Sequence, residues 1–576
     1  MSLSVRPRIT RRELTAIVFL CAAFLLLNAW WVWRFRLGQP LDIDEAGYFS
    51  RSFRDFRALQ TGGLPAWIGA IETGGMQAPL TPALSSLLYL AGGPSIFAGF
   101  FVPMLAGAVT VAATFSIGKS VGSTRLGILS ALLVASSPAL IDYSRDYTFA
   151  APVTAITAIA LLALIRSRRL RIRGWAYVFG VFLGLMPLAR TMAIAFVPGL
   201  LAAAAIQVAI DDRRAQLSRR FFSVVLVAVL VSATWLMHSG RDVIRYLVGY
   251  GYGMHSTEFG ERQSLLSPAS WLETARNIAG TMFLPGFAIL IAGAAIVLFM
   301  EARTAREIGI KSTARKILSS PMLPLVALVI GGLCALTSSG NKGSGFVLPL
   351  VPPMFVLACW AFLKLTNGKD LIVAIVGYFA TVLWLTMVAL SPPLALPWQA
   401  TLPALGAITI SDGRGNIQLY ELAGGFSGRN PLMPVDPVDG RRWLRTIAIV
   451  SDDVGMRRPV AFGFRHRLLN GNAMDVERLL SGKIDIAHAM VDPIVYGNSI
   501  DAYVRWLTTG DAAASCVLAT ADDRRGQFPP AVTSRLMEAA ALRAGFTRFR
   551  SHRLPDGASV TVWRRADERC RLNGEH

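Results

Sequence analysis

The chain contains repeated apolar segments that are each long enough to cross a lipid bilayer. The first covers residues 14–36, and others follow as far as residue 390. A helix needs roughly 20 mostly apolar residues to span the hydrocarbon core of a membrane. Hydrophobic residues make up 53% of the chain and charged residues 16%, which suits a protein embedded in lipid. The pattern predicts a polytopic α-helical membrane protein.

Eleven membrane spans are predicted in the first 390 residues. A shorter apolar run, Pro79 to Leu90, is too short to cross, so we expect an interfacial or re-entrant helix there. The predicted spans are 14–36, 96–118, 125–141, 148–165, 174–189, 191–210, 221–238, 277–300, 321–338, 345–363 and 370–390.

Lysine and arginine are concentrated in alternate loops, which predicts the orientation. Five arginines lie in residues 166–173 and four in residues 211–220, whereas the longer loops between them carry fewer cations for their length. The positive-inside rule therefore places the N-terminus in the cytoplasm. Eleven crossings then place residues 391–576 outside. We expect a multi-pass protein of the bacterial cytoplasmic (inner) membrane with an extracytoplasmic C-terminal domain.

The net charge of +21 raises the question of nucleic-acid binding. Cytoplasmic loops of membrane proteins carry excess cations that face anionic lipid, and this accounts for most of the charge. We therefore expect membrane lipid as a partner and no nucleic acid.

The composition changes after the last span, which predicts three regions. They are a transmembrane domain (1–390), a connecting segment rich in proline and glycine (391–440) and an extracytoplasmic α/β domain (441–576). The connecting segment is expected to pack irregularly. In the α/β domain, short β-prone runs alternate with helical stretches. The predicted strands are 446–451, 460–464, 484–490, 516–519 and 560–563, and the predicted helices are 474–480 and 532–544.

Cys516 and Cys570 are the two cysteines expected in an oxidising compartment. A disulfide between them remains open, although a cysteine within a strand is more often a buried thiol, which is our interpretation of Cys516.

An acidic motif, Asp44-Glu45-Ala46-Gly47-Tyr48, lies in the first outer loop, residues 37–95. Acidic groups beside hydrocarbon are costly unless they have a function or a partner. Asp44 is expected at the N-cap of the following helix, which is a structural explanation for it. With Asp42 and Glu45 alongside, like charges and lipid would raise its pKa, as suits a general base.

The residues after Asp44 are predicted to form an amphipathic helix on the membrane surface. Its apolar face would carry Phe49, Phe53, Phe56 and Leu59, and its polar side would carry Arg51, Arg54, Asp55 and Arg57.

Cations recur in other loops on the same outer face. Arg145 and Asp146 lie between the third and fourth spans, Arg190 between the fifth and sixth, and Lys342 between the ninth and tenth. Each alone could be an interfacial side chain. Together they converge at one end of the bundle, where Arg145, Arg190 and Lys342 could bind a phosphate.

These features resemble the GT-C glycosyltransferases that use polyprenyl-phosphate sugars, a group that includes protein O-mannosyltransferases and lipid A aminoarabinose transferases. The resemblance covers roughly residues 14–363. It rests on the Asp44 to Tyr48 motif, Ala78-Pro79-Leu80, the span end from Gly184 to Thr191, and Asn341 to Pro352. The family's acid-Lys pair before Pro-Pro is replaced by Met76-Gln77, so the donor or acceptor can differ.

The resemblance implies that the catalytic residues are Asp44, as the general base, and Glu45. Arg190, Lys342 and Arg145 would neutralise the phosphate of a lipid-linked sugar donor. The supporting residues would be Asp42, Tyr48, Asp146 and Asn341. Asp146 follows its arginine at once rather than several residues later, which counts against a second catalytic acid. Whether a metal, Mg²⁺ or Mn²⁺, takes part is left open.

The predicted function is therefore an inverting glycosyltransferase that moves a sugar from a polyprenyl-phosphate donor to a cell-envelope acceptor, whether glycan, lipid or protein. Two alternatives are a transporter or flippase of lipid-linked sugars and a polysaccharide ligase or polymerase. The first should show polar or broken helices at the bilayer midplane. The second should centre on a large late loop.

The predicted orientation can be tested with a reporter that is active only outside the cytoplasm. Fused after His576 it should be active, and fused after Arg169 it should be inactive, because residues 166–173 belong to a cation-rich inner loop. Equal activity at the two positions would contradict eleven crossings.

Overall fold

The structure is a computed structural model of the 576-residue chain. The residues that it describes are 10–258, 267–309, 312, 318–341, 345–365, 398–402, 406–411, 418–422, 437–454, 459–497, 499–522, 526–527, 532, 534–565 and 570.

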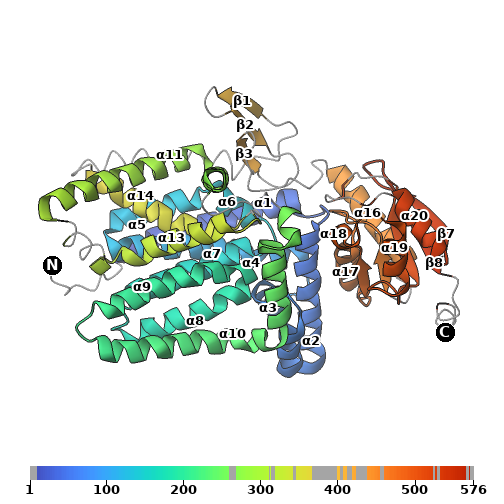
Figure 1. Ribbon diagram of the computed structural model, residues 1–576, viewed down its shortest axis with the longest axis horizontal. Helices are drawn as coiled ribbons and strands as arrows, with labels where there is room; N and C mark the ends of the chain where they lie inside the picture. Colours follow the sequence, from blue (N-terminus) through green and yellow to red (C-terminus); the bar gives the residue numbers. More distant parts are fainter. Residues whose placement is uncertain are drawn as a thin grey trace.

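The N-terminal part is a bundle of apolar helices, at one end of which sits a smaller α/β domain (Figure 1). The predicted class, a polytopic helical membrane protein with a C-terminal α/β domain, is confirmed. The bundle helices are α1 Arg11–Trp31, continued by the π-helix η1 Val32–Arg36; α4 Ile96–Val121, α5 Thr124–Ala135, α6 Pro138–Tyr143, α7 Ala150–Arg166, α8 Arg173–Ala189, η2 Thr191–Phe196, α9 Val197–Ala209, α10 Arg214–Gly251, α11 Pro268–Ile308, α13 Leu323–Ser338, η4 Leu348–Leu350 and α14 Val351–Leu365.

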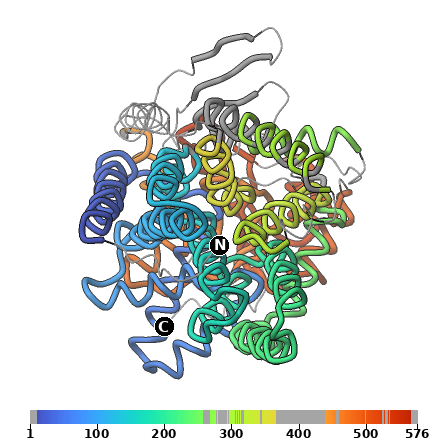
Figure 2. Tube along the Cα trace, turned by 90° about the vertical axis from the view of Figure 1, so that its left-hand side faces the viewer, coloured from blue at the N-terminus to red at the C-terminus, as the bar shows by residue number. Residues whose placement is uncertain are grey.

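Each of the first ten predicted spans overlaps one or more of these helices, and the eleventh, 370–390, lies outside the described residues. Within the described part, four helical segments are long and apolar enough to cross a membrane: Arg11–Arg36, Ile96–Val121, Thr191–Ala209 and Arg214–Gly251. Shorter apolar helices pack among them (Figure 2). The turn between α9 and α10 lies at the end of the bundle far from the C-terminal domain (Figure 1).

Helix starts in the bundle follow local capping chemistry. Ser95 accepts a hydrogen bond from Ala98 N at 3.1 Å before α4, and Ser123 accepts one from Leu126 N at 3.2 Å before α5. Each serine satisfies a backbone donor that has no partner within its helix.

A long helix, α2 Ile43–Thr73, runs across the end of the bundle and is followed by α3 Leu80–Leu88, which lies within the predicted short apolar run (Figure 1). Gly63 interrupts α2 with a φ of 65°, a conformation that glycine adopts without strain. The chain reverses there. As a result, Ile71 O accepts a hydrogen bond from the Arg51 guanidinium at 3.1 Å.

The prediction of a polar outer face on this helix is wrong for two residues. Arg51 is 4% exposed and Asp55 is 2% exposed. Arg51 is covered by the returning segment, where Gln77 O also accepts from it. The other side of the helix packs on the bundle through Phe49, which stacks on Tyr147 with ring centroids 3.7 Å apart. The helix is enclosed rather than laid on a lipid surface.

The C-terminal domain is built on a five-stranded sheet in the order β5-β4-β6-β8-β7. β4 is parallel to β5 and β6, whereas β8 is antiparallel to both β6 and β7. The strands are β4 Val460–Phe462, β5 His488–Met490, β6 Val517–Ala521, β7 Phe546–Arg553 and β8 Ser559–Arg565. The helices are α16 Pro437–Val454, α17 Gly471–Leu480, α18 Pro493–Tyr496, α19 Ile500–Thr508 and α20 Ser534–Arg543.

The two faces of this sheet bury different side chains. On one face, Trp443 of α16 and Met474 of α17 share a hydrophobic cluster with Phe49 of α2. On the other, Trp506 of α19 and Met537 of α20 form a separate cluster. α16 and α17 therefore cover the face toward the bundle, and the core of the domain continues into α2.

The predicted strand at 446–451 is wrong, because these residues lie within α16. The β-branched run suggested a strand, but the buried positions Trp443, Ile447, Val450 and Val454 are spaced by three and four residues, the helical period. The expectation of an irregular connecting segment is also corrected. The antiparallel strands β1 Trp398–Leu402, β2 Gly406–Ser411 and β3 Gln418–Leu422 lie within it.

Cys516 and Cys570 form a disulfide with their Cα atoms 5.6 Å apart, which corrects the interpretation of Cys516 as a buried thiol. Arg565 N, at the end of β8, donates to Cys516 O at 2.9 Å. This strand pairing brings the chain that follows β8 close to Cys516.

Two glycines let α8 and α10 approach closely. A Cβ atom at Gly180 would lie 2.7 Å from Val224 O, and one at Gly184 would lie 2.8 Å from Val231 Cβ. Ser232 Oγ donates to Gly184 O at 2.9 Å across the same contact. Small residues permit this kind of helix contact in membranes.

Replacing Gly184 by leucine should push α8 and α10 apart and destabilise the fold by about 1–3 kcal/mol, the usual scale of overpacking. Thermal unfolding of the purified protein in detergent would show a lower midpoint. Gly174→Ala is the matched control, because a Cβ there meets nothing within 4 Å. Identical midpoints for Gly184→Leu and the control would contradict the close contact.

Candidate active site at the end of the bundle beside the C-terminal domain

The acidic motif forms the first turn of α2. Asp42, not Asp44, is the N-cap: its Oδ1 accepts a hydrogen bond from Asp44 N at 2.8 Å. Glu45 completes a capping box by accepting from Asp42 N at 3.2 Å. The prediction of Asp44 at the N-cap is therefore wrong by two residues. Since Asp42 and Glu45 cap the helix, the Asp44 carboxylate is free of that role.

Glu45 links α2 to the membrane bundle through an ion pair and a hydrogen bond. It is 1% exposed and forms an ion pair with Arg36, at the end of the first membrane segment. Its Oε1 accepts from Tyr147 N at 3.2 Å, and Arg36 also donates to Pro40 O at 3.0 Å. Both carboxylate oxygens are thus engaged. This placement suits a residue that positions Asp44 more than one that transfers a proton.

Asp44 keeps an exposed side chain among buried neighbours, yet protein atoms surround it closely enough to raise the pKa of its carboxyl. Burial is the largest cause of the raised pKa, and the charge of Glu45 adds to it, whereas Arg190 and Arg465 oppose it. A carboxylate with a raised pKa is a stronger base, as general-base catalysis requires.

Arg190 comes from the junction of α8 and η2 and interacts electrostatically with Asp44 and Tyr48. Its guanidinium lies 3.2 Å from the ring centroid of Phe149 and 3.7 Å from that of Phe346. The two rings hold the cation in place by cation–π attraction. Of the predicted site residues, the structure therefore brings together Asp44, Tyr48 and Arg190.

A cavity of about 200 Å³ adjoins Arg190. Among its lining residues in the described part of the chain, Arg190 alone carries a charge. The remaining wall is mostly apolar and comes from α7, η2, the end of α10, the end of α13 and the segment that contains η4, including Val153, Leu247, Leu336 and Pro349. The arrangement offers an apolar chamber with a cation at its edge.

Arg145 and Asp146 lie in the turn between α6 and α7. Arg145 is 2% exposed and donates from Nε to Asn28 Oδ1 at 2.7 Å, with its guanidinium 4.4 Å from the Trp31 ring centroid. Asp146 is buried and accepts from Thr148 Oγ1 at 3.1 Å. Arg145 therefore links the α6–α7 turn to α1, and the contact of Asp146 with Thr148 lies within the turn.

Two predicted residues come from the segment before α14. Asn341 is buried, and its backbone N donates to Oγ of Ser339, which lines the cavity, at 3.2 Å. Lys342 lies outside the described residues.

Three residues near the site were not predicted from the sequence. Arg465, from the loop between β4 and α17, interacts electrostatically with Asp44. Tyr143 and Tyr246 do so with Arg190. Arg465 carries no local sequence signal, because its position depends on how two distant parts of the chain pack.

The carboxylates of the motif do not fit a shared Mg²⁺ or Mn²⁺ site in this conformation. Asp42 caps α2 and Glu45 is held by Arg36, which leaves Asp44 as the open carboxylate. Within the described ranges, no group of three or more His, Cys, Asp and Glu residues is arranged to hold a metal ion.

Comparisons with known proteins place the chain among related folds. Residues 76–238 match the dolichyl-phosphate-mannose-protein mannosyltransferase family, a region that includes Arg190 and begins after Asp44. ArnT from Cupriavidus metallidurans is 14% identical, with TM-scores of 0.54 in the apo state and 0.53 with undecaprenyl phosphate bound; each alignment covers 95% of this chain and 98% of ArnT.

The archaeal oligosaccharyltransferase AglB from Archaeoglobus fulgidus, in complex with an inhibitory peptide and a dolichol-phosphate, is 10% identical with a TM-score of 0.51. That alignment covers 96% of this chain and 74% of AglB. No curated protein matches the chain in sequence. At these identities, the structural likeness establishes the fold.

The buried ion pair of Arg36 and Glu45 should contribute strongly to the free energy of unfolding. Glu45→Gln leaves the Arg36 charge buried without its partner, which typically costs about 3–5 kcal/mol. We expect a large fall in the thermal midpoint, and partial recovery in the double variant Arg36→Met/Glu45→Leu, which removes both charges. A Glu45→Gln protein that melts like the wild type would show that the pair is not needed.

Proposed function

We propose that this chain, which has the GT-C fold of membrane glycosyltransferases, transfers a sugar from a polyprenyl-phosphate donor to an acceptor in the cell envelope. The observation that carries the proposal is an exposed carboxylate, Asp44, that interacts electrostatically with Arg190, a cation held against two aromatic rings beside an apolar cavity of the membrane bundle.

The cavity and Arg190 suit the two parts of a lipid phosphate. Isoprenyl units would pack against the apolar walls of the cavity, and the phosphate would bind the guanidinium of Arg190. The bound undecaprenyl phosphate of ArnT and the bound dolichol-phosphate of AglB support this choice of donor. Lys342 is proposed as a second cation, because it follows Asn341 near the cavity.

The proposed reaction is a single displacement with inversion. Asp44 accepts the proton of the acceptor hydroxyl as its oxygen forms a bond to the anomeric carbon. The bond from that carbon to the phosphate oxygen breaks, and the lipid phosphate leaves with the electron pair. Arg190 stabilises the negative charge that develops on the leaving phosphate. Glu45 and Asp42 hold Asp44 in position through the capping box.

We further propose that the protein resides in the cytoplasmic membrane, with the N-terminus inside and the C-terminal domain outside, as the distribution of lysine and arginine predicts. The donor phosphate would then lie in the outer leaflet, where cell-envelope acceptors are found.

Replacing Asp44 by asparagine tests the general base. The change keeps the size of the side chain and removes no cap, since Asp42 supplies it, so folding should be normal. Turnover should fall by about 100-fold or more, the usual contribution of a general base. The measurement is the rate of sugar release from the lipid donor in membranes that contain equal amounts of each variant.

Asp501→Asn is the matched control, because Asp501 also lies in the first turn of a helix, α19, but on the far face of the C-terminal domain. Asp55→Asn is unsuitable as a silent control, because Asp55 is buried. Full activity in Asp44→Asn would remove Asp44 from the mechanism. If activity is lost only in Glu45→Gln, and that variant unfolds at the wild-type temperature, the base would be Glu45 rather than Asp44.

A further inference from the structure

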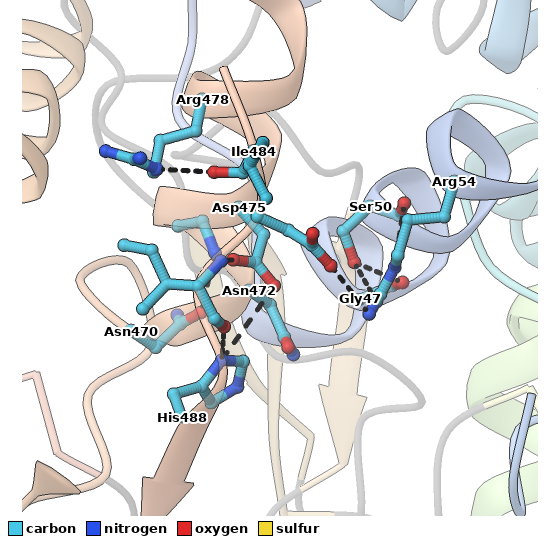
Figure 3. A network of polar contacts seen from close by, with 12 residues as sticks. Gly47, Ser50, Arg54, Asn470, Asn472, Asp475, Arg478, Ile484 and His488 are labelled. Carbon is cyan, nitrogen blue, oxygen red and sulfur yellow. Dashed lines mark hydrogen bonds and ion pairs between the residues drawn. The ribbon is translucent and has the colours of Figure 1, made fainter. Parts of the chain in front are cut away.

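The C-terminal domain contacts the helix turn that carries Asp44. Figure 3 shows Asn472 of α17 beside Gly47 of α2. Asn472 Nδ2 donates a hydrogen bond to the backbone oxygen of Ile43 at 3.0 Å, between residues that are 429 positions apart in the chain. A Cβ atom at Gly47 would lie 3.0 Å from the same amide nitrogen, so glycine leaves room for the Asn472 side chain.

This hydrogen bond acts on the peptide group that precedes the Asp44 side chain. The Ile43 oxygen and the Asp44 nitrogen belong to one planar peptide group, and the Cα atom of Asp44 lies in the same plane. Asn472 donates to the oxygen, and Asp42 Oδ1 accepts from the nitrogen at 2.8 Å. Two hydrogen bonds at opposite ends of the plane restrict its rotation. They therefore restrict the point from which the Asp44 side chain leaves the backbone.

Asn472 is itself held in place by the fold of the C-terminal domain. It lies in the first turn of α17, where the side chain of the N-cap residue, Asn470, accepts from Ala473 N at 3.0 Å. Further along the helix, Asp475 is 1% exposed and accepts from Ile486 N at 2.8 Å, which joins α17 to the segment before β5 (Figure 3). The amide of Asn472 therefore approaches α2 from a fixed helix.

The contact between α17 and α2 has an apolar part and an ionic part. Met474 of α17 and Phe49 of α2 are buried in one hydrophobic cluster. Arg54 of α2 forms an ion pair with Asp485 at 3.4 Å, with the Arg54 side chain 47% exposed (Figure 3). Exposed ion pairs contribute little to stability. We therefore expect the apolar cluster to hold the domain against α2, with or without Arg54.

We propose that Asn472 is a positioning residue, whose hydrogen bond to the Ile43 oxygen holds the Asp44 carboxylate in the direction that catalysis requires. This inference rests on the proposed function, in which Asp44 is the general base. A displacement of about 1 Å in a catalytic group can lower a rate about 100-fold. The C-terminal domain then contributes to turnover through the first turn of α2.

Turnover of two Asn472 variants tests the hydrogen bond. Asn472→Ala removes the donor and should lower the rate of sugar release at saturating lipid donor by about tenfold or more. The KM for the lipid donor should not change, because Arg190 and the apolar cavity are untouched. Asn472→Asp keeps the size of the side chain, and an acid is favourable near a helix N-terminus, but it cannot donate to Ile43 O. Its turnover should fall as well.

Arg54→Gln is the matched control. It removes the ion pair with Asp485 from the same interface and leaves the hydrogen bond of Asn472 intact, so turnover should stay at the wild-type level. Thermal unfolding of the purified protein in detergent should give similar midpoints for the control and for Asn472→Asp. An equal loss of turnover in Arg54→Gln and Asn472→Ala would assign the effect to docking of the domain and contradict the role of Asn472.

Hydrogen exchange, measured by mass spectrometry on the full-length protein, tests the same bond without any substrate. In Asn472→Ala, the backbone amides of residues 43–48 should exchange about fivefold faster, the scale of one hydrogen bond. Arg54→Gln should leave their exchange unchanged. Wild-type exchange in Asn472→Ala would show that the bond does not hold the turn.

The outcomes separate this inference from the proposed function. If Asp44→Asn is inactive while Asn472→Ala keeps full turnover, the inference alone is wrong. Loss of turnover in Asn472→Asp but not in Asn472→Ala would indicate an effect of the added charge, and would also overturn it. Full activity in Asp44→Asn would instead overturn the proposed role of Asp44, whatever the exchange of residues 43–48.

Discussion

The ion pair between Arg36 and Glu45 joins the end of the first membrane helix to the first turn of α2. Both side chains are buried, and Glu45 also receives a hydrogen bond from the backbone of Tyr147. Charges in such a place are costly unless each is matched by its partner. The requirement to match them fixes the angle at which α2 leaves the bundle, and therefore where Asp44 points.

The residues that pack around α2 come from both the membrane bundle and the C-terminal domain. Its aromatic residues pack on Phe100 and Tyr147 of the bundle, and the same hydrophobic cluster extends to Phe462 and Met474 of the C-terminal domain. A helix that looks amphipathic in sequence is thus buried on most sides. The buried Arg51 is satisfied by backbone oxygens of the chain that returns after Gly63.

The sequence predicted those features that depend on local or periodic patterns. Apolar length located the bundle helices, and acidic residues beside a span located Asp44. The strand at 446–451 failed because β-branched residues outweighed a helical spacing of buried positions. The N-cap was misplaced by two residues because three acids lie close together in the sequence. The structure distinguishes them by the capping box, in which Asp42 accepts from Asp44 N and Glu45 accepts from Asp42 N.

Arg465 and the enclosure of Asp55 could not be predicted, because both depend on contacts between segments far apart in the chain. The same holds for the disulfide of Cys516, whose partner is brought close by the pairing of β6 with β8.

The continuity between the C-terminal domain and α2 also has a bearing on biogenesis. Asp44 emerges early in synthesis, but Asn472 and Arg465, which complete its surroundings, are made more than 400 residues later. A nascent chain with its first helices already inserted carries the Asp44 carboxylate without the C-terminal domain that packs on the first turn of α2. Assembly of the site is therefore delayed until the last domain has folded, so a truncated or stalled chain lacks a complete site even when every membrane helix is in place.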